Sequence, residues 1–236
     1  MRRPRLLDLY CGAGGASMGY HQAGFEVVGV DIRPQSRYPF AFVQADALEY
    51  VAAHGHEFDV IHASPPCQAY TRLRSLVEGK TGRKRDYPDL VAPTREALRD
   101  TGKIYVIENV AGAPLQNPIM LCGEMFGLRV FRHRYFETNV FLLAPSHPRH
   151  PRGSTTNAYH ARSGFANGAT HIGVYGDAYI LADGKAAMDI DWMVRRELNQ
   201  AIPPAYTRWL GEQLIAHYFP EYDYADQSQR LSRQLG

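Results

Sequence analysis

The stretch "RLLDLYCGAGGASMGYHQAGFEVVGVDI", residues 5–32, decides the fold class of this chain. Its first apolar run, residues 5–10, is typical of a short buried strand, and it leads directly into closely spaced glycines that precede a helix. A second apolar run, residues 26–32, predicts the next strand. Together they predict a strand–helix–strand unit with two parallel strands and a crossover helix.

The same alternation continues along the chain. Further strands are predicted near the start of "FVQADALEYVAA" and within "FDVIHASPP", "KIYVIENV" and "RVFRHRYFETNVFLL", and helices within "DALEYVAA" and "YPDLVAPTREALRD". Strands that alternate with helices predict an α/β fold with a mainly parallel sheet. Ligands of such sheets bind beyond the carboxyl ends of the strands, which is where the motifs below fall.

The later part of the chain changes character. Residues 144–189 are rich in Pro, His, Gly, Ser, Thr and Asn, and we interpret them as a small second lobe or an elaborate loop. A helical pattern returns after residue 190, with a break at "IPP", a final helix predicted from about Pro203 to Tyr218, and a polar tail. We therefore predict three parts, residues 1–143, 144–189 and 190–236.

Composition is that of an ordinary globular protein. The 236 residues suffice for a sizeable core, and the net charge of +2 does not by itself demand a nucleic-acid partner. Three cysteines without a CxxC pair argue against a disulfide framework and against a zinc site. The chain lacks an apolar run of membrane-spanning length and a signal-peptide pattern, so a soluble cytoplasmic protein is expected.

The glycines after the first predicted strand indicate a cofactor site. Gly12, Gly14 and Gly15 allow a tight turn and a close approach of the backbone to a ligand, while Asp31, at the end of the next strand, suits a ribose diol. The spacing does not match a G-x-G-x-x-G dinucleotide fingerprint, and a turn required only by packing is the alternative. Asp46 suits an adenine amine or a helix N-cap equally well.

Cys67 stands on a stiff bend, "SPPCQ", directly after a predicted strand. A thiol held in this way suits a nucleophile, and the nearby Arg72 and Arg74 would favour its thiolate form. An inert buried cysteine is the alternative, but the polar residues around it are poor core material.

Glu108 ends the next strand and would face the same crevice as Cys67. Burial there would raise its pKa and let it act as an acid near neutrality; a helix cap or a surface carboxylate is the alternative. Arg132 and Arg134 alternate with Phe131 and His133, so both arginines are predicted on one face of a strand. Two positive charges on one face suit a phosphate or a polar base edge, and an ordinary solvent-exposed face is the alternative.

Basic residues cluster in the segment "RLRSLVEGKTGRKR". Its glycines could act as hinges, and the segment could close over a polyanion. Phosphate contacts in the variable part are suggested for Arg149, Arg152 and Arg162, with a solvated loop as the equal alternative. The histidines of this part, His147, His150, His160 and His171, do not have the spacing of metal ligands, and no metal is predicted.

These motifs, and their order along the chain, resemble those of the cytosine-C5 DNA methyltransferases. "LLDLYCGAGGASMGY" resembles the family's first S-adenosylmethionine motif, "PPCQ" its nucleophile motif, "ENV" its protonating glutamate, "RHR" its paired arginines and "NQAIPPAY" its final motif. Val130 departs from the family's usual glutamine, Asn199 and Gln200 replace its usual Gly-Asn, and the variable part is short.

The resemblance implies a Rossmann-like class I methyltransferase sheet. It also implies a catalytic part at residues 1–143, a target-recognition lobe at 144–189, and a C-terminal segment at 190–236 that returns to the catalytic part. Implied catalytic residues are Cys67, Glu108, Arg132 and Arg134. Implied contacts to S-adenosylmethionine are Asp8, Tyr10, Gly12, Gly14, Gly15, Asp31, Ile32, Asp46, Pro65 and Gln200. Implied DNA contacts are Gln68, Arg72, Arg74, Lys80, Arg83, Lys84 and Arg85.

By this resemblance Cys67 would add to carbon 6 of a cytosine flipped out of double-stranded DNA, and Glu108 would protonate ring nitrogen 3. A bacterial or phage-encoded monomer with a role in restriction-modification is the expected setting. Open alternatives are the same chemistry on RNA such as tRNA, a non-catalytic relative that binds cofactor and nucleic acid, and, with the weakest support, a nicotinamide-dependent oxidoreductase.

Overall fold

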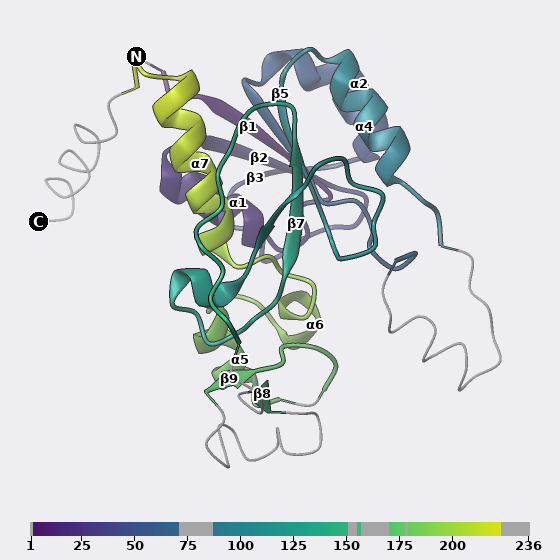
Figure 1. Cartoon of the computed structure of the whole chain (residues 1–236). Helices are drawn as coiled ribbons and strands as arrows, with labels where there is room; N and C mark the ends of the chain where they lie inside the picture. Colours follow the sequence, from purple (N-terminus) through teal and green to yellow (C-terminus); the bar gives the residue numbers. More distant parts are fainter. Residues whose placement is uncertain (1, 71–86, 151–154, 157–169, 178, 223–236) are drawn as a thin grey trace, which may run out of the picture.

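A seven-stranded sheet forms the centre of the computed structural model, which describes residues 2–70, 87–150, 155–156, 170–177 and 179–222 (Figure 1). Its strands lie in the order β3-β2-β1-β4-β5-β7-β6. Their bounds are β1 Arg5–Leu9, β2 Glu26–Asp31, β3 Ala41–Gln44, β4 Val60–Ala63, β5 Ile104–Asn109, β6 Ile119–Leu121 and β7 Arg134–Thr138.

The first five strands are parallel, and β7 runs antiparallel to both β5 and β6. The predicted α/β fold with a mainly parallel sheet is therefore confirmed. The sequence patterns also located the strands correctly, because strands that are covered on both faces appear as short continuous apolar runs. Strand β6 was not predicted, since its three residues are too few to show a period.

Helices cover both faces of the sheet. Helices α1 (Gly15–Ala23) and α7 (Pro204–Tyr218) lie side by side on one face, and α2 (Ala47–His54) and α4 (Val91–Asp100) lie on the other (Figure 1). Successive residues of β1 serve the two layers: Leu6 packs with the α1–α7 side, and Leu7 packs with the α2–α4 side. Two short 3₁₀ turns, η1 (Gly55–Glu57) and η2 (Gly123–Phe126), complete this part.

The C-terminal segment returns to the N-terminal motif. The predicted final helix is confirmed as α7, and its first turn lies so close to α1 that a Cβ on Gly19 would stand 2.1 Å from the carbonyl oxygen of Pro204. A Cβ on Gly15 would likewise collide with the backbone carbonyl of Ile202. The glycines of α1 therefore serve helix packing as well as the turn that precedes them.

A smaller lobe lies beyond the carboxyl ends of the parallel strands (Figure 1). It contains β8 (Thr155–Thr156), β9 (His171–Ile172), α5 (Leu181–Met188) and α6 (Arg195–Leu198). Val174, Tyr179, Met188 and Leu198 are buried in a cluster that reaches Ala13 of the glycine turn. Helix α5 falls in the region where periodicity fades, and the domain boundaries at residues 143 and 189 stay a prediction.

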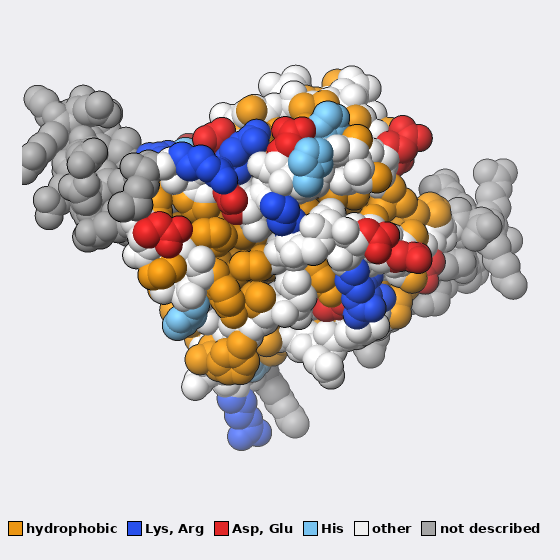
Figure 2. Space-filling model, turned by 90° about the horizontal axis from the view of Figure 1, so that it is seen from above, with side chains coloured by type: hydrophobic (Ala, Val, Ile, Leu, Met, Phe, Trp, Pro, Cys, Tyr) orange, Lys and Arg blue, Asp and Glu red, His pale blue; other side chains and the backbone are white. Residues whose placement is uncertain are grey.

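Charges are mixed on the end of the molecule seen from above, where blue and red side chains lie among apolar ones (Figure 2). Among the described residues, no helix combines the length and the apolar character that crossing a membrane requires.

Candidate active site

Cys67 lies on a bend that three strands hold in place. The Ser64 amide donates to the Leu9 carbonyl at 3.1 Å, which continues the pairing of β4 with β1. The Asn109 side chain, from β5, donates to the Pro65 carbonyl at 2.9 Å. Beyond the cysteine, the Tyr70 amide closes a turn onto the Cys67 carbonyl at 3.0 Å. The partly buried thiol is thus carried by a fixed backbone, as the prolines predict.

Glu108 lies at the carboxyl end of β5, the neighbour of β4, and is 6% exposed. Burial raises the pKa of its carboxyl, although the charges of Arg134 and Arg132 and a hydrogen bond from Ser64 oppose this rise. The Arg134 Nε atom lies 3.0 Å from Oε1 of Glu108, an ion-pair contact that is not aligned as a hydrogen bond. One buried carboxyl oxygen is therefore left without a hydrogen-bond partner.

Cys67 and Glu108 lie close enough to influence each other. Burial, and secondly the charge of Glu108, raise the pKa of the Cys67 thiol, while Arg134 and Arg132 lower it. The described surroundings therefore favour the protonated thiol, which differs from the expectation of a thiolate stabilised by neighbouring cations. The cations named in that expectation, Arg72 and Arg74, lie outside the described residues.

The shared strand face predicted for Arg132 and Arg134 is wrong. Strand β7 begins at Arg134, and Arg132 precedes it with a left-handed φ of 34°. The Arg132 guanidinium donates to three carbonyls, those of Ala201 at 2.8 Å, Val174 at 2.9 Å and Asn199 at 2.7 Å. Its burial lowers the pKa of Arg132 to about 9. Arg132 thus joins the segment before β7 to the smaller lobe and the C-terminal segment, and a contact to substrate stays a prediction.

The glycine turn and Asp31 form one unit. Gly12 and Gly14 have left-handed φ values of 50° and 83°, which favour glycine. The Gly12 amide donates to Oδ2 of Asp31 at 3.1 Å, and the Arg33 amide donates to Oδ1 at 2.9 Å. The carboxylate is therefore fixed at the mouth of the turn, beside Ile32, which is 65% exposed.

Residues 4–117, which contain the glycine turn, Asp31, Cys67 and Glu108, match the model of the C-5 cytosine-specific DNA methylase family. This part of the chain is similar to that family. A curated relative, the type II methyltransferase M.XorII of Xanthomonas oryzae pv. oryzae, is 32% identical over 130 residues. The match covers 48% of this chain and 29% of the relative, so the chain spans less than a third of that protein.

Solved structures share the fold. A candidate DNA modification methyltransferase encoded within an Escherichia coli prophage has a TM-score of 0.61 at 13% identity, over 90% of this chain and 99% of that one. The Dnmt2 methyltransferase of Schizosaccharomyces pombe has a TM-score of 0.55 at 13% identity, over 91% and 99%. At such low identity these likenesses show the class I methyltransferase fold alone.

Next to the glycine turn, the chain has a buried polar network that the sequence did not reveal. Asp8 is fully buried and accepts a hydrogen bond from the Ser17 hydroxyl, which pairs with the Tyr38 hydroxyl at 2.7 Å. Burial raises the pKa of Asp8 to about 7, and its Oδ1 atom has no hydrogen-bond partner. The predicted contact of Asp8 with the cofactor stays a prediction, and its hydrogen-bond partner in this structure is Ser17 of α1.

The other residues predicted to contact the cofactor have varied surroundings. Asp46 caps α2 by accepting from the amides of Leu48 at 2.8 Å and Glu49 at 3.1 Å, so its predicted alternative as an N-cap is confirmed. Tyr10 pairs with the Thr94 hydroxyl at 3.0 Å. Pro65 is buried, whereas Gln68 and Gln200 are exposed. Arg149, a suggested phosphate contact, is exposed, and the other suggested nucleic-acid contacts lie outside the described residues: Lys80, Arg83, Lys84, Arg85, Arg152 and Arg162.

Two supporting side chains escaped prediction. Asn109 follows Glu108 in the "ENV" motif, and this position is a signal that could have pointed to its hydrogen bond with the bend that carries Cys67. Trp192 donates to the carbonyl of Ala13 at 2.8 Å across 179 positions of sequence, and no local pattern signals such a contact.

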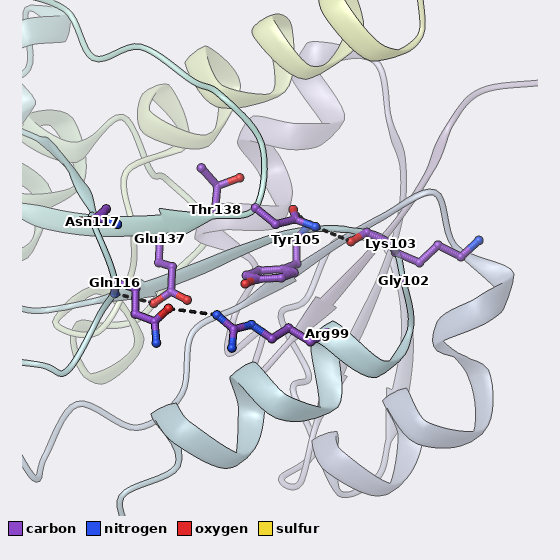
Figure 3. A pocket seen from close by; sticks show the side chains of 9 residues that line it. Arg99, Gly102, Lys103, Tyr105, Gln116, Asn117, Glu137 and Thr138 are labelled. Atoms are coloured by element: carbon purple, nitrogen blue, oxygen red, sulfur yellow. Dashed lines mark hydrogen bonds between the residues drawn. The ribbon is translucent and has the colours of Figure 1, made fainter.

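A surface cavity of about 350 Å³ lies apart from the predicted catalytic residues, near the amino end of β5 (Figure 3). Its lining includes Arg99, Gln116 and Glu137, which are already paired. Arg99 donates to Gln116 at 2.9 Å, and Glu137 receives the Gln116 amide at 2.7 Å and the guanidinium of Arg95. These groups stabilise the join between α4 and β7, and they add nothing to the chemistry at the carboxyl ends of the strands.

Proposed function

We propose that this chain methylates carbon 5 of cytosine in double-stranded DNA, with S-adenosylmethionine as the donor and Cys67 as the nucleophile. The observation that carries the proposal is the pairing of Cys67 with Glu108 at the carboxyl ends of adjacent strands, with Arg134 against Glu108. A buried acid with a raised pKa and a thiol on a fixed bend are the two groups this chemistry needs.

The residues around the glycine turn fit the donor. Asp31 is fixed by two backbone amides, exposes lone pairs for a diol, and stands next to an exposed apolar side chain, Ile32. When bound, S-adenosylmethionine supplies an electrophilic methyl group on a sulfonium centre. Gly12 leaves room for its close approach to the backbone, whereas a Cβ on Gly14 would stand 3.0 Å from the side chains of Tyr38 and Pro39.

The chain's own groups prepare the base. Cys67 first loses its thiol proton to water, and the thiolate sulfur then forms a bond to carbon 6 while Glu108 delivers a proton to ring nitrogen 3, so that electron density moves to carbon 5. After methylation, the carbon-5 proton passes to water, its electrons form the double bond to carbon 6 as the bond to Cys67 breaks, and Glu108 recovers its proton from nitrogen 3. Arg134 limits the charge that would build up on Glu108 when it gives up that proton.

Access to carbon 6 requires the target base to leave the helix stack, which costs a few kcal/mol. In this proposal the flipped base is received beyond the carboxyl ends of β4 and β5, beside Cys67 and Glu108. The printed name of the Xanthomonas relative, a type II methyltransferase, supports a role in a restriction-modification setting.

The proposal is tested with a labelled methyl donor and three polymers: double-stranded DNA, single-stranded DNA and tRNA. We expect label in double-stranded DNA, and label in tRNA alone would contradict the choice of substrate. Cys67→Ala is expected to abolish transfer while calorimetry shows nearly unchanged binding of the donor, because the thiol acts on the base and not on the cofactor.

A trapping experiment tests the covalent step separately. DNA that carries 5-fluorocytosine cannot lose the carbon-5 substituent as a proton, so the adduct with Cys67 should persist on a denaturing gel. Cys67→Ala should give no such band. Methyl transfer at a near wild-type rate by Cys67→Ala would show that another group is the nucleophile.

A further inference from the structure

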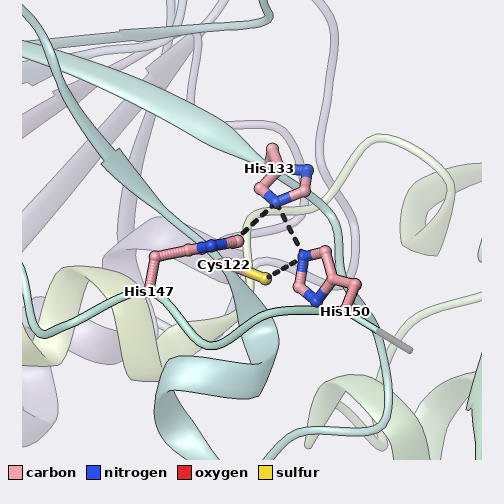
Figure 4. Close-up of side chains that lie close together, drawn as sticks. All are labelled: Cys122, His133, His147 and His150. Carbon is pink, nitrogen blue, oxygen red and sulfur yellow. Dashed lines mark hydrogen bonds between the residues drawn. The ribbon is translucent and has the colours of Figure 1, made fainter.

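Four side chains that the proposed reaction does not use converge beside the start of β7 (Figure 4). Cys122 follows β6, His133 precedes β7, and His147 and His150 come from the segment that follows β7. One nitrogen from each histidine and the sulfur of Cys122 all lie within 4.8 Å of one another. Three separate stretches of chain therefore bring metal-ligating atoms to one point.

The spacing of these atoms is close to that of a zinc coordination shell. Nε2 of His133 lies 3.0 Å from Nε2 of His147 and 3.0 Å from Nε2 of His150, and Sγ of Cys122 lies 3.5 Å from Nε2 of His150. A tetrahedral zinc ion with ordinary bond lengths places two nitrogens about 3.3 Å apart and a nitrogen and a sulfur about 3.6 Å apart. Small side-chain shifts would complete the shell.

Hydrogen bonding alone does not account for this arrangement. A ring nitrogen of histidine has one in-plane position, either a proton or a lone pair, so Nε2 of His133 cannot bond well to both neighbouring nitrogens. A shared cation satisfies three such lone pairs and a thiolate at once.

Residues around the cluster hold His150 and Cys122 in orientations that suit metal ligands. Nδ1 of His150 lies 2.6 Å from a carboxylate oxygen of Glu124, and metal-bound histidines usually offer their second nitrogen to such a group. The ring of Phe131 packs on His150 with centroids 3.8 Å apart. Gly123 donates to the Phe131 carbonyl at 2.9 Å, which holds Cys122 beside the start of β7.

We propose that Cys122, His133, His147 and His150 bind one zinc ion in a structural site. Four protein ligands leave no open position for a substrate, and a set of one thiolate with three imidazoles suits zinc better than magnesium or calcium. Binding would release the thiol proton of Cys122. The site would tie the segment at residues 147–150 to β7 and would hold His133 between Arg132 and Arg134. The proposal departs from the sequence-based expectation of no metal.

Metal analysis of the purified full chain tests the site directly. We expect about one zinc per chain, and cobalt added to the chelator-treated protein should give the visible bands of tetrahedral coordination with a thiolate charge-transfer band. Cys122→Ser should remove the charge-transfer band. His147→Ala, which changes an exposed side chain, should lower the affinity for zinc by at least about tenfold without preventing folding.

Two further variants complete the test. Glu124→Gln should weaken zinc binding by about 10–100-fold, because it removes the partner of His150. His56→Ala, at an exposed histidine on η1, should leave the metal content unchanged. Absence of zinc together with absence of cobalt bands in the folded wild-type chain would overturn the proposal, as would equal metal content in His147→Ala and the wild type.

Discussion

Glu108 is buried against an arginine and still has a raised pKa, because loss of solvation outweighs the attraction of Arg134 and Arg132. A protonated carboxyl at this point can give a proton to a ring nitrogen. Cys67, which also has a raised pKa, must lose its proton before it attacks. The two residues therefore need opposite protonation states, and their titrations are coupled.

At the residue scale, we predict that the wild-type rate of methyl transfer has a bell-shaped pH profile. As pH rises, the thiolate fraction of Cys67 increases while the protonated fraction of Glu108 falls, since both pKa values are raised. Glu108→Gln should lower the rate by about 10²–10⁴-fold and leave a profile that only rises with pH. Single-turnover rates across the neutral and alkaline range measure this, and a falling alkaline limb in the variant would assign that limb to another group.

At the scale of elements, the contact between α1 and α7 depends on glycine. Gly19 is a helical residue with an ordinary φ, so the reason for glycine there is space: a methyl group would collide with the backbone of Pro204 and with Thr207. The same contact fixes the position of the glycine turn, which precedes α1, relative to the C-terminal segment. The packing of α1 on α7 therefore affects the shape of the predicted cofactor site.

We predict that Gly19→Ala destabilises the fold by roughly 1–3 kcal/mol or more, because overpacking against backbone cannot be relieved by a side-chain rotation. For a chain of this length that corresponds to a fall in Tm of about 2–4 °C per kcal/mol. Ala216→Ser, which adds one atom at an exposed position of α7, is the control and should leave Tm almost unchanged. A thermal melt in which both variants equal the wild type would refute the close contact.

At the scale of the whole molecule, Arg132 connects parts that are distant in sequence. Its three hydrogen bonds reach Val174 in the smaller lobe and Asn199 and Ala201 before α7. The left-handed backbone at Arg132 turns its side chain toward these carbonyls, while Arg134 stays against Glu108. One arginine of the pair therefore organises the protein, and the other serves the proposed chemistry.

We predict that Arg132→Lys lowers Tm, since a lysine cannot reproduce the planar set of donors and leaves carbonyls unsatisfied at a cost of about 1–3 kcal/mol. Arg134→Lys should lower Tm less than Arg132→Lys, because lysine keeps a positive charge beside Glu108, but it should lower kcat, because the planar guanidinium geometry at Glu108 is lost. Thermal melts beside steady-state kinetics separate the two. Unchanged stability with lost activity in Arg132→Lys would restore its predicted contact with substrate.

The sequence by itself determined the parallel strands β1 to β5 with the helices between them, the glycine turn, and the bend that carries Cys67 next to the strand that carries Glu108, but not β6, β8, β9 or α5. These follow from local patterns: apolar runs, glycine and proline at turns, and the rule that parallel strands present their carboxyl ends together. Only the tertiary structure decided the role of Arg132, the hold of Trp192 on the glycine turn, and the meeting of Cys122 with His133, His147 and His150. Such contacts join residues far apart in the chain, and their positions depend on how whole elements pack, which no local period encodes.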